Sequence, residues 1–84
     1  MPLRGVRRAA RLELVPDEVV FEVTQEADGG YAAECLTEPI VTQADSWEEL
    51  RDEVRDAVRA YWYDGEPPRQ IRLHLVRDEL LATA

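Results

Sequence analysis

The chain contains 84 residues, of which 45% are hydrophobic and 33% are charged, and its formal net charge is −8. This length allows one small domain and excludes a two-domain enzyme, a doubly wound nucleotide-binding sheet and a barrel. The composition is typical of a folded domain. The acidic excess disfavours nucleic acid as a ligand, because phosphates would repel the chain, and it favours a basic protein partner.

The chemistry open to the chain is limited by its single cysteine, Cys35, and its single histidine, His74. One residue of each type cannot form an intramolecular disulfide or a zinc tetrad. No apolar run approaches the 18 residues of a membrane-spanning helix, and the first residues lack the apolar stretch of a secretory signal. We therefore expect a cytoplasmic protein without a metal or another cofactor.

Residues 1–16 differ in charge from the rest of the chain, since they hold four of the ten arginines and one acidic residue, Glu13. Pro16 separates this segment from the acidic remainder of the chain and disfavours a helix in the residue before it. We expect residues 1–16 to form a flexible basic arm and residues 17–84 to form a single domain. The arm is either a disordered tail or a contact for an acidic neighbour or RNA.

A hairpin of two strands is predicted after the arm. Residues 19–26 and 31–36 are rich in strand-forming side chains, and the sequence Ala-Asp-Gly-Gly between them is a turn signal. If Tyr31, Ala33 and Cys35 share the face of Phe21, Glu34 points away from the core. That register needs a loop of odd length, which indicates a bulge at a glycine.

The strongest pattern predicts a helix that begins after Ser46. Ser46 is a good N-cap, and Glu49 stands three residues later and completes a capping box. Apolar residues at helical spacing predict one buried face, made up of Trp47, Leu50, Val54, Ala57, Val58 and Tyr61. Acid–arginine pairs at i,i+3 spacing occupy the opposite face, namely Glu48/Arg51, Asp52/Arg55 and Asp56/Arg59. Gly65 and two prolines end the helix.

A short edge strand at residues 40–42, after Pro39, and a last strand at residues 70–76 complete the predicted fold. A right-handed crossover from the third strand places the fourth beside the first and parallel to it. We therefore predict an α+β fold of β-β-β-α-β order, with a four-stranded mixed sheet in the order 3-2-1-4 and one helix on one face. The residues after Val76 are expected to form one frayed turn.

One helix can cover only one face of such a sheet, which leaves an open face. Its predicted members are half apolar and half polar, namely Val20, Glu22, Thr24, Ala32, Glu34, Leu36, Arg72, His74 and Val76. One wet face is compatible with a monomer. The apolar members and the small core favour a homodimer or a bound partner, through face-to-face packing or edge pairing. Trp62 and Tyr63 follow the helix and either complete the core or anchor a partner.

Three sequence runs carry a resemblance to a known family. They are Phe21-x-Val23, then Asp28-Gly29-Gly30-Tyr31-x-Ala33, then Thr42-Gln43-x-Asp45-Ser46-x-Glu48-Glu49-Leu50. In this order and spacing, residues 19–76 resemble the HicB family of antitoxins. The resemblance implies a partial RNase H-like fold, whose β-β-β-α-β order agrees with the order predicted from the residues.

The same resemblance implies a protein that oligomerises and that binds and masks HicA, a small basic toxin that cleaves RNA. Family antitoxins usually carry a C-terminal DNA-binding segment, whereas this sequence has eight residues after Val76. It therefore resembles a short form, for which direct DNA binding is not expected. The alternative is an orphan dimeric structural or adaptor domain without a toxin partner.

An RNase H-like outline invites a search for paired metal carboxylates. Glu22 and Glu34 are predicted neighbours across two strands, and Asp52 lies on the predicted helix. Two-metal catalysis needs carboxylates that converge within about 4 Å of shared ions, and the solvent face of the helix points away from the strand pair. His74 beside Glu22 or Glu34 would resemble an acid–base pair, but an outward strand histidine is commonly plain surface. We therefore expect a binding protein with no catalytic, cofactor-binding or metal-binding residues.

Overall fold

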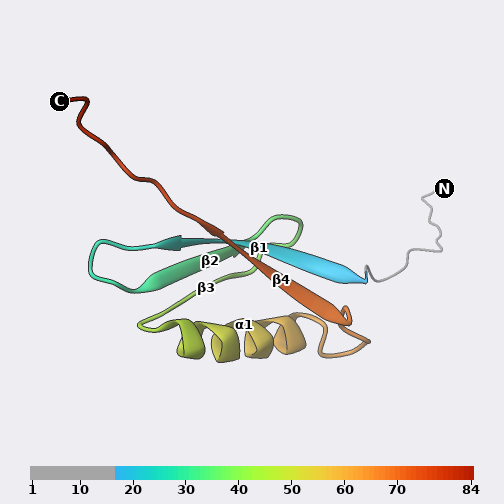
Figure 1. Cartoon of the computed structure of the whole chain (residues 1–84). Coiled ribbons are helices and arrows are strands. Elements are labelled where there is room, and N and C mark those ends of the chain that lie inside the picture. Colours follow the sequence, from blue (N-terminus) through green and yellow to red (C-terminus); the bar gives the residue numbers. More distant parts are fainter. Residues whose placement is uncertain (1–16) are drawn as a thin grey trace.

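The computed structural model describes residues 17–84, so the predicted basic arm of residues 1–16 lies outside the described residues. The elements occur in the order β1 (Glu18–Gln25), β2 (Tyr31–Cys35), β3 (Val41–Ala44), α1 (Trp47–Tyr61) and β4 (Gln70–Val76). They form one four-stranded sheet in the order β3-β2-β1-β4 with α1 on one side of it (Figure 1). The predicted α+β class, strand order and single helix are confirmed.

The sheet is mixed, because β2 pairs antiparallel with β1 and β3 while β4 runs parallel to β1. The crossover through α1 brings β4 beside β1, as the right-handed rule requires. Phe21 pairs with Cys35 and Val23 with Ala33, so the predicted hairpin register is confirmed. Gly29 has a φ of +96°, a left-handed value that an odd-length hairpin loop needs and that glycine adopts without strain.

Helix α1 begins as predicted. The side chain of Ser46 accepts a hydrogen bond from the Glu49 backbone N–H at 3.1 Å. The return bond of a full capping box differs, because the Glu49 carboxylate accepts from the N–H of Asp45 at 3.3 Å rather than from that of Ser46. Two of the three predicted acid–arginine pairs form, Asp52/Arg55 at 3.3 Å and Asp56/Arg59 at 3.1 Å.

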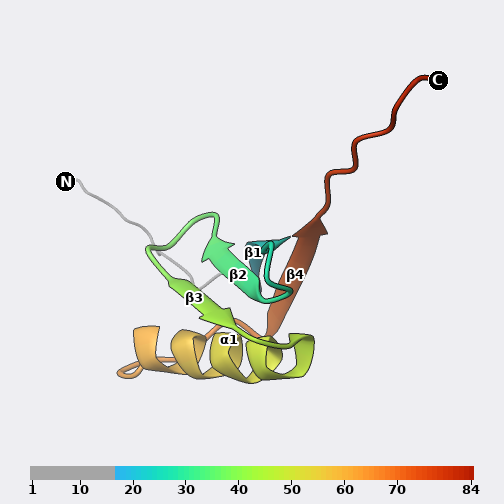
Figure 2. The ribbon, with the colours of Figure 1, turned by 90° about the vertical axis from the view of Figure 1, so that its left-hand side faces the viewer.

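The core lies between α1 and the adjacent face of the sheet. Figure 2 shows the helix running beneath the strands on that side alone. Leu50, Val54 and Val58 of the helix are fully buried against Phe21 and Val23 of β1. Each such side chain contributes about 1.5–3 kcal/mol when it leaves water. Cys35 is also buried, as a small apolar residue of this core.

The structure differs from the prediction at Tyr61, near the end of the helix, and in the bounds of the third strand, which is present at the sheet edge as expected. The helical pattern places Tyr61 in the core, but this residue is 43% exposed, and the neighbouring Trp62 packs against the core instead. The Tyr61 hydroxyl donates to the Glu38 carboxylate at 2.8 Å, which holds its ring at the surface. The third strand begins at Val41 rather than Ile40, because the Ile40 N–H closes a tight turn onto the Glu38 carbonyl at 2.8 Å.

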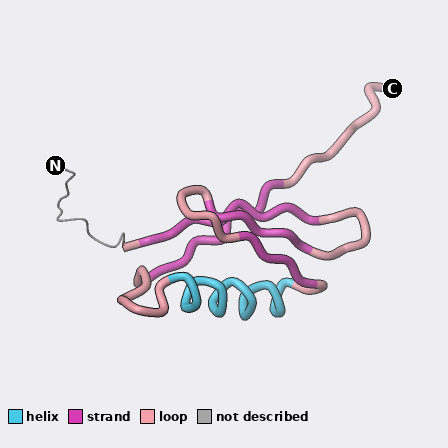
Figure 3. Tube along the Cα trace, turned by 180° about the vertical axis from the view of Figure 1, so that it is seen from behind, coloured by secondary structure: helices cyan, strands magenta, loops and turns pink. Residues whose placement is uncertain are grey.

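Residues Arg77–Ala84, called the tail here, also differ from expectation. They form no helical turn but run on from β4 in an irregular extended path (Figure 3). Figure 1 shows the tail continuing in the direction of β4, beyond the edge of the sheet and away from α1. Among residues 17–84, no helix is long and apolar enough to cross a membrane.

Candidate functional site

The register places eight of the nine predicted members of the open face on the side of the sheet opposite α1, and the ninth, Leu36, directly follows β2 and donates its backbone N–H to the Val20 carbonyl at 3.0 Å. Strand residues that alternate with the buried Val19, Phe21 and Val23 point to this side. One row crosses all four strands, because Val41 pairs with Glu34, Glu34 with Glu22, and Glu22 with His74. A parallel row contains Gln43, Ala32, Thr24 and Val76.

The central feature of the open face is a pair of like charges. Glu22 lies directly opposite Glu34 on the neighbouring antiparallel strand, and both side chains are exposed. Carboxylates in this position repel each other and destabilise the sheet. Among the described residues, no ion pair reaches either of them. A cationic side chain from another molecule would therefore find two acceptors side by side here.

The arginine at the margin of the open face already has a partner. Arg72 on β4 donates two hydrogen bonds to Glu18 on β1, with N–O distances of 2.6 and 3.1 Å. The hydrogen bond from the guanidinium lowers the pKa of the Glu18 carboxyl below its ordinary value. The same contact raises the pKa of Arg72. This bidentate pair leaves Arg72 engaged with Glu18 rather than with the two central carboxylates.

The open face also exposes apolar side chains. Leu36 is 61% exposed, and Val20, Ala32 and Val76 are half-buried. Val41, which is 72% exposed, belongs to the same face and was missed from the sequence. Neighbouring residues of a strand point to opposite faces, and Thr42 points toward the helix, so Val41 points to the open face. This alternation assigns Val41 to a face only once the strand is known to extend to Ala44.

Trp62 and Tyr63 do not join the other predicted interface residues. Both come after the last turn of α1, on the helix side of the sheet. The Trp62 ring packs edge-on against the Tyr61 ring, with 4.8 Å between their centroids, and it covers the end of the core. Tyr63 is exposed there. The open face is therefore built from strand residues and from Leu36, which directly follows β2.

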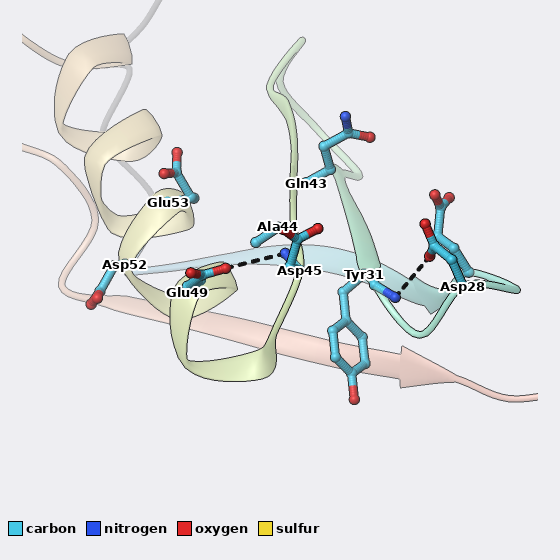
Figure 4. A pocket seen from close by; sticks show the side chains of 10 residues that line it. Asp28, Tyr31, Gln43, Ala44, Asp45, Glu49, Asp52 and Glu53 are labelled. Carbon is cyan, nitrogen blue, oxygen red and sulfur yellow. Dashed lines mark hydrogen bonds between the residues drawn. The ribbon is translucent and has the colours of Figure 1, made fainter.

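A second polar surface has no counterpart among the sequence predictions. A shallow groove of about 470 Å³ lies between the β1–β2 turn, the end of β3 and the first turns of α1 (Figure 4). We call it the acidic groove, because six of its lining residues are acidic, namely Glu26, Asp28, Asp45, Glu49, Asp52 and Glu53. Gln43 lines this groove and also lies on the open face, so the two surfaces meet at β3.

The carboxylates of the molecule do not converge on one point. Asp52 and the other helix acids line the acidic groove or face solvent, whereas Glu22 and Glu34 lie on the far side of the sheet. Within residues 17–84, no group of three or more histidine, cysteine or acidic side chains is arranged to hold a metal ion. Both surfaces are shallow and negatively charged, an arrangement that can bind a cationic surface.

Comparison with known proteins gives two similar sequences. A protein of Thermotoga maritima named "UPF0150 protein" is 35% identical over 65 residues, which cover 77% of this chain and 91% of the relative. A second protein, from Archaeoglobus fulgidus and with the same name, is 47% identical over 53 residues, which cover 63% of this chain and 79% of the relative. No family model matches the chain, and no solved structure matches it.

Proposed function

The chain belongs to the UPF0150 family, and from this starting point we propose that it is a non-catalytic protein-binding module of the HicB type. In this proposal, its open face binds and masks a small basic HicA-type toxin that cleaves RNA. The fold is then a partial RNase H-like fold, and the protein works in the cytoplasm, where its partner meets RNA.

The resemblance to HicB antitoxins rests on residues with clear roles in the fold. Phe21 and Val23 fill the core, Gly29 closes the hairpin with its left-handed backbone, and Ser46 caps the helix. These residues support a shared architecture. They do not touch the open face, so the binding role needs its own support.

The observation that carries the proposal is the acidic centre of the open face, which forms no ion pair with the residues that the structure describes. Glu22 and Glu34 repel each other in the isolated chain, and an arginine or lysine placed between them would relieve that repulsion. The surrounding apolar residues, Val20, Ala32, Leu36, Val41 and Val76, supply area for desolvation. From Asp17 onward, six arginines stand against seventeen acidic residues, so the domain also attracts a basic partner at long range.

Calorimetric titration of the full chain with a purified HicA-type toxin tests the proposal. We expect a complex with a Kd in the micromolar range or tighter, and loss of the toxin's RNA cleavage at equimolar chain. The double variant Glu22→Arg/Glu34→Arg replaces attraction with repulsion. It should weaken binding by at least about a hundredfold, since buried contacts between like charges cost several kcal/mol.

A matched control carries the same change of charge elsewhere. Glu48→Arg/Asp64→Arg alters two exposed acids of the helix and of the loop after it, away from the open face. This control should weaken binding only modestly and lose that effect at high salt. No complex at about 100 µM, or equal weakening by the two double variants, would overturn the proposal.

A second candidate function is a dimeric structural or adaptor domain without a toxin partner. The observation that favours it is the outer edge of β4, which pairs with no described strand and can pair with another copy without using the open face. Absence of a toxin-like open reading frame beside the gene, together with a stable homodimer and no toxin binding, would select this candidate.

A further inference from the structure

The outer edge of β4 is less covered by other elements than the rest of the sheet. β4 ends the strand order and pairs only with β1, so its other edge carries N–H and C=O groups that no described strand satisfies. Helix α1 packs chiefly over β3 and β2. Figure 2 shows β4 running away from the helix toward the tail. A seven-residue strand with a free edge is a template for pairing.

The inner side of β4 is apolar and only half covered. Ile71 and Leu73 are half-buried, and a small groove of about 130 Å³ separates them from Val54 of the helix. The groove continues toward the start of β4 into a second hollow of about 340 Å³. We call this second hollow the arginine groove, because Arg55, Arg59 and Arg69 line it together with Val58, Pro68 and Ile71.

The tail has the complementary chemistry. Its sequence contains Asp78 and Glu79 followed by Leu80 and Leu81. Leu80 is 98% exposed and Leu81 is 78% exposed, and no hydrogen bond or ion pair joins the tail to any other described residue. Two adjacent leucines held out in water are surface that association would bury.

We propose that two copies of the chain pair antiparallel through their β4 edges and that each tail occupies the arginine groove of the other copy. A two-fold axis beside β4 places the residues that follow Val76 of one copy next to the residues that precede Gln70 of its partner. The arginine groove lies there. Asp78 and Glu79 then meet the three arginines, while Leu80 and Leu81 pack on the half-buried Ile71 and on the exposed Pro67, which also lines the groove.

The arginines of the groove are free to change partners. Arg55, Arg59 and Arg69 pair with Asp52, Asp56 and Asp17, but all three pairs are solvent-exposed at 3.1–3.3 Å. Exposed pairs of this kind contribute little to stability. This dimer goes beyond the toxin binding proposed above, because it uses the β4 edge and leaves the open face accessible.

Sedimentation equilibrium of the full chain tests this dimer. We expect the wild type to have the mass of a dimer, and Leu80→Asp/Leu81→Asp to raise the dimer dissociation constant at least about tenfold. Ala82→Asp/Ala84→Asp adds the same charge to the same segment without removing the leucines and should change the constant less than about threefold. The tail lies outside the folded sheet, so both variants should keep the wild-type circular dichroism spectrum.

A charge exchange gives an independent test. Asp78→Arg/Glu79→Arg and Arg55→Glu/Arg59→Glu should each weaken the homodimer. Mixed together, the two variants should form a heterodimer, because each tail then meets a groove of opposite charge. A wild-type monomer at about 100 µM, a dimer unaffected by the leucine changes, or a mixture without heterodimer would overturn the proposal. Leu80→Asp/Leu81→Asp should still bind toxin, so failure of this dimer is distinguishable from failure of the proposed function.

Discussion

At the scale of single residues, Glu22 and Glu34 are a pair of like charges that costs the isolated sheet stability. They lie opposite each other on adjacent strands, with exposed side chains. A folded sheet selected for stability alone would place an opposite charge or a β-branched side chain at one of the two positions. Their repulsion costs the isolated chain stability that a cationic partner would restore.

Replacing Glu22 by glutamine should therefore stabilise the isolated protein. The change keeps the shape and removes one of two like charges, so the free energy of unfolding should rise by about 0.2–1 kcal/mol. Urea denaturation at about pH 8 measures it, and the gain should shrink in about 1 M salt as the repulsion is screened. The same change at Glu48, in the first turn of α1, should instead lower stability slightly. A Glu22→Gln protein no more stable than the wild type would contradict the repulsion.

The Glu18–Arg72 pair makes stability depend on pH. Because the contact lowers the pKa of Glu18, the folded state favours the charged carboxylate more than the unfolded state does. Its contribution is present above the ordinary carboxyl pKa and is lost as the pH falls through the lowered one. Arg72→Gln should flatten the fall in thermal midpoint below about pH 5. Thermal melts from neutral to acidic pH measure this dependence. If the thermal midpoint of the variant falls with pH as steeply as that of the wild type, the pair does not contribute to the pH dependence of stability.

At the scale of elements, helix α1 depends on a cap that the sequence already indicates. Ser46→Ala leaves the Glu49 N–H without its acceptor and should cost about 1 kcal/mol of folding stability. Ser46→Asp supplies an alternative acceptor and should restore most of the loss. Urea denaturation of the two variants measures the difference, and equal stability of both would show that the cap contributes nothing.

The elements also show what sequence patterns can and cannot predict. Alternation in β1 and β2, with an odd-length loop, fixes the hairpin register because a one-residue slip would expose Phe21. Helical periodicity predicts the buried positions of α1 up to Val58. It fails at Tyr61, because the carboxylate that holds its hydroxyl belongs to Glu38, 23 residues earlier. That contact depends on the tertiary fold and leaves no local signal.

Of the candidate surfaces, the sequence predicts the open face but not the two grooves. The members of the open face on β1, β2 and β4 were predictable, because a single helix covers one side and side chains alternate along each strand. The acidic groove was not, since the turn, β3 and α1 contribute to it from separate parts of the chain. The arginine groove likewise joins α1 to the residues before β4. Grooves between elements emerge only when the packing of the helix on the sheet is known.

For the whole molecule, the arginines are distributed unevenly along the described chain. All six arginines from residue 17 onward lie between Arg51 and Arg77, on α1, β4 and the segments next to them. The acidic groove lies around the hairpin turn, the end of β3 and the first turns of α1, where Asp52 lines it and also pairs with Arg55 of the arginine groove. Under the two proposals, a second copy occupies the β4 edge and a basic protein binds the open face.

The central claim is that the open face binds another protein. The most direct measurement is methyl NMR of the full chain during titration with a HicA-type toxin. We predict that the methyl groups of Val20, Ala32, Leu36 and Val76 shift or broaden, while those of the buried Val23 and Val54 change little. Changes confined to the exposed side of α1, or no change at about 100 µM toxin, would contradict the claim.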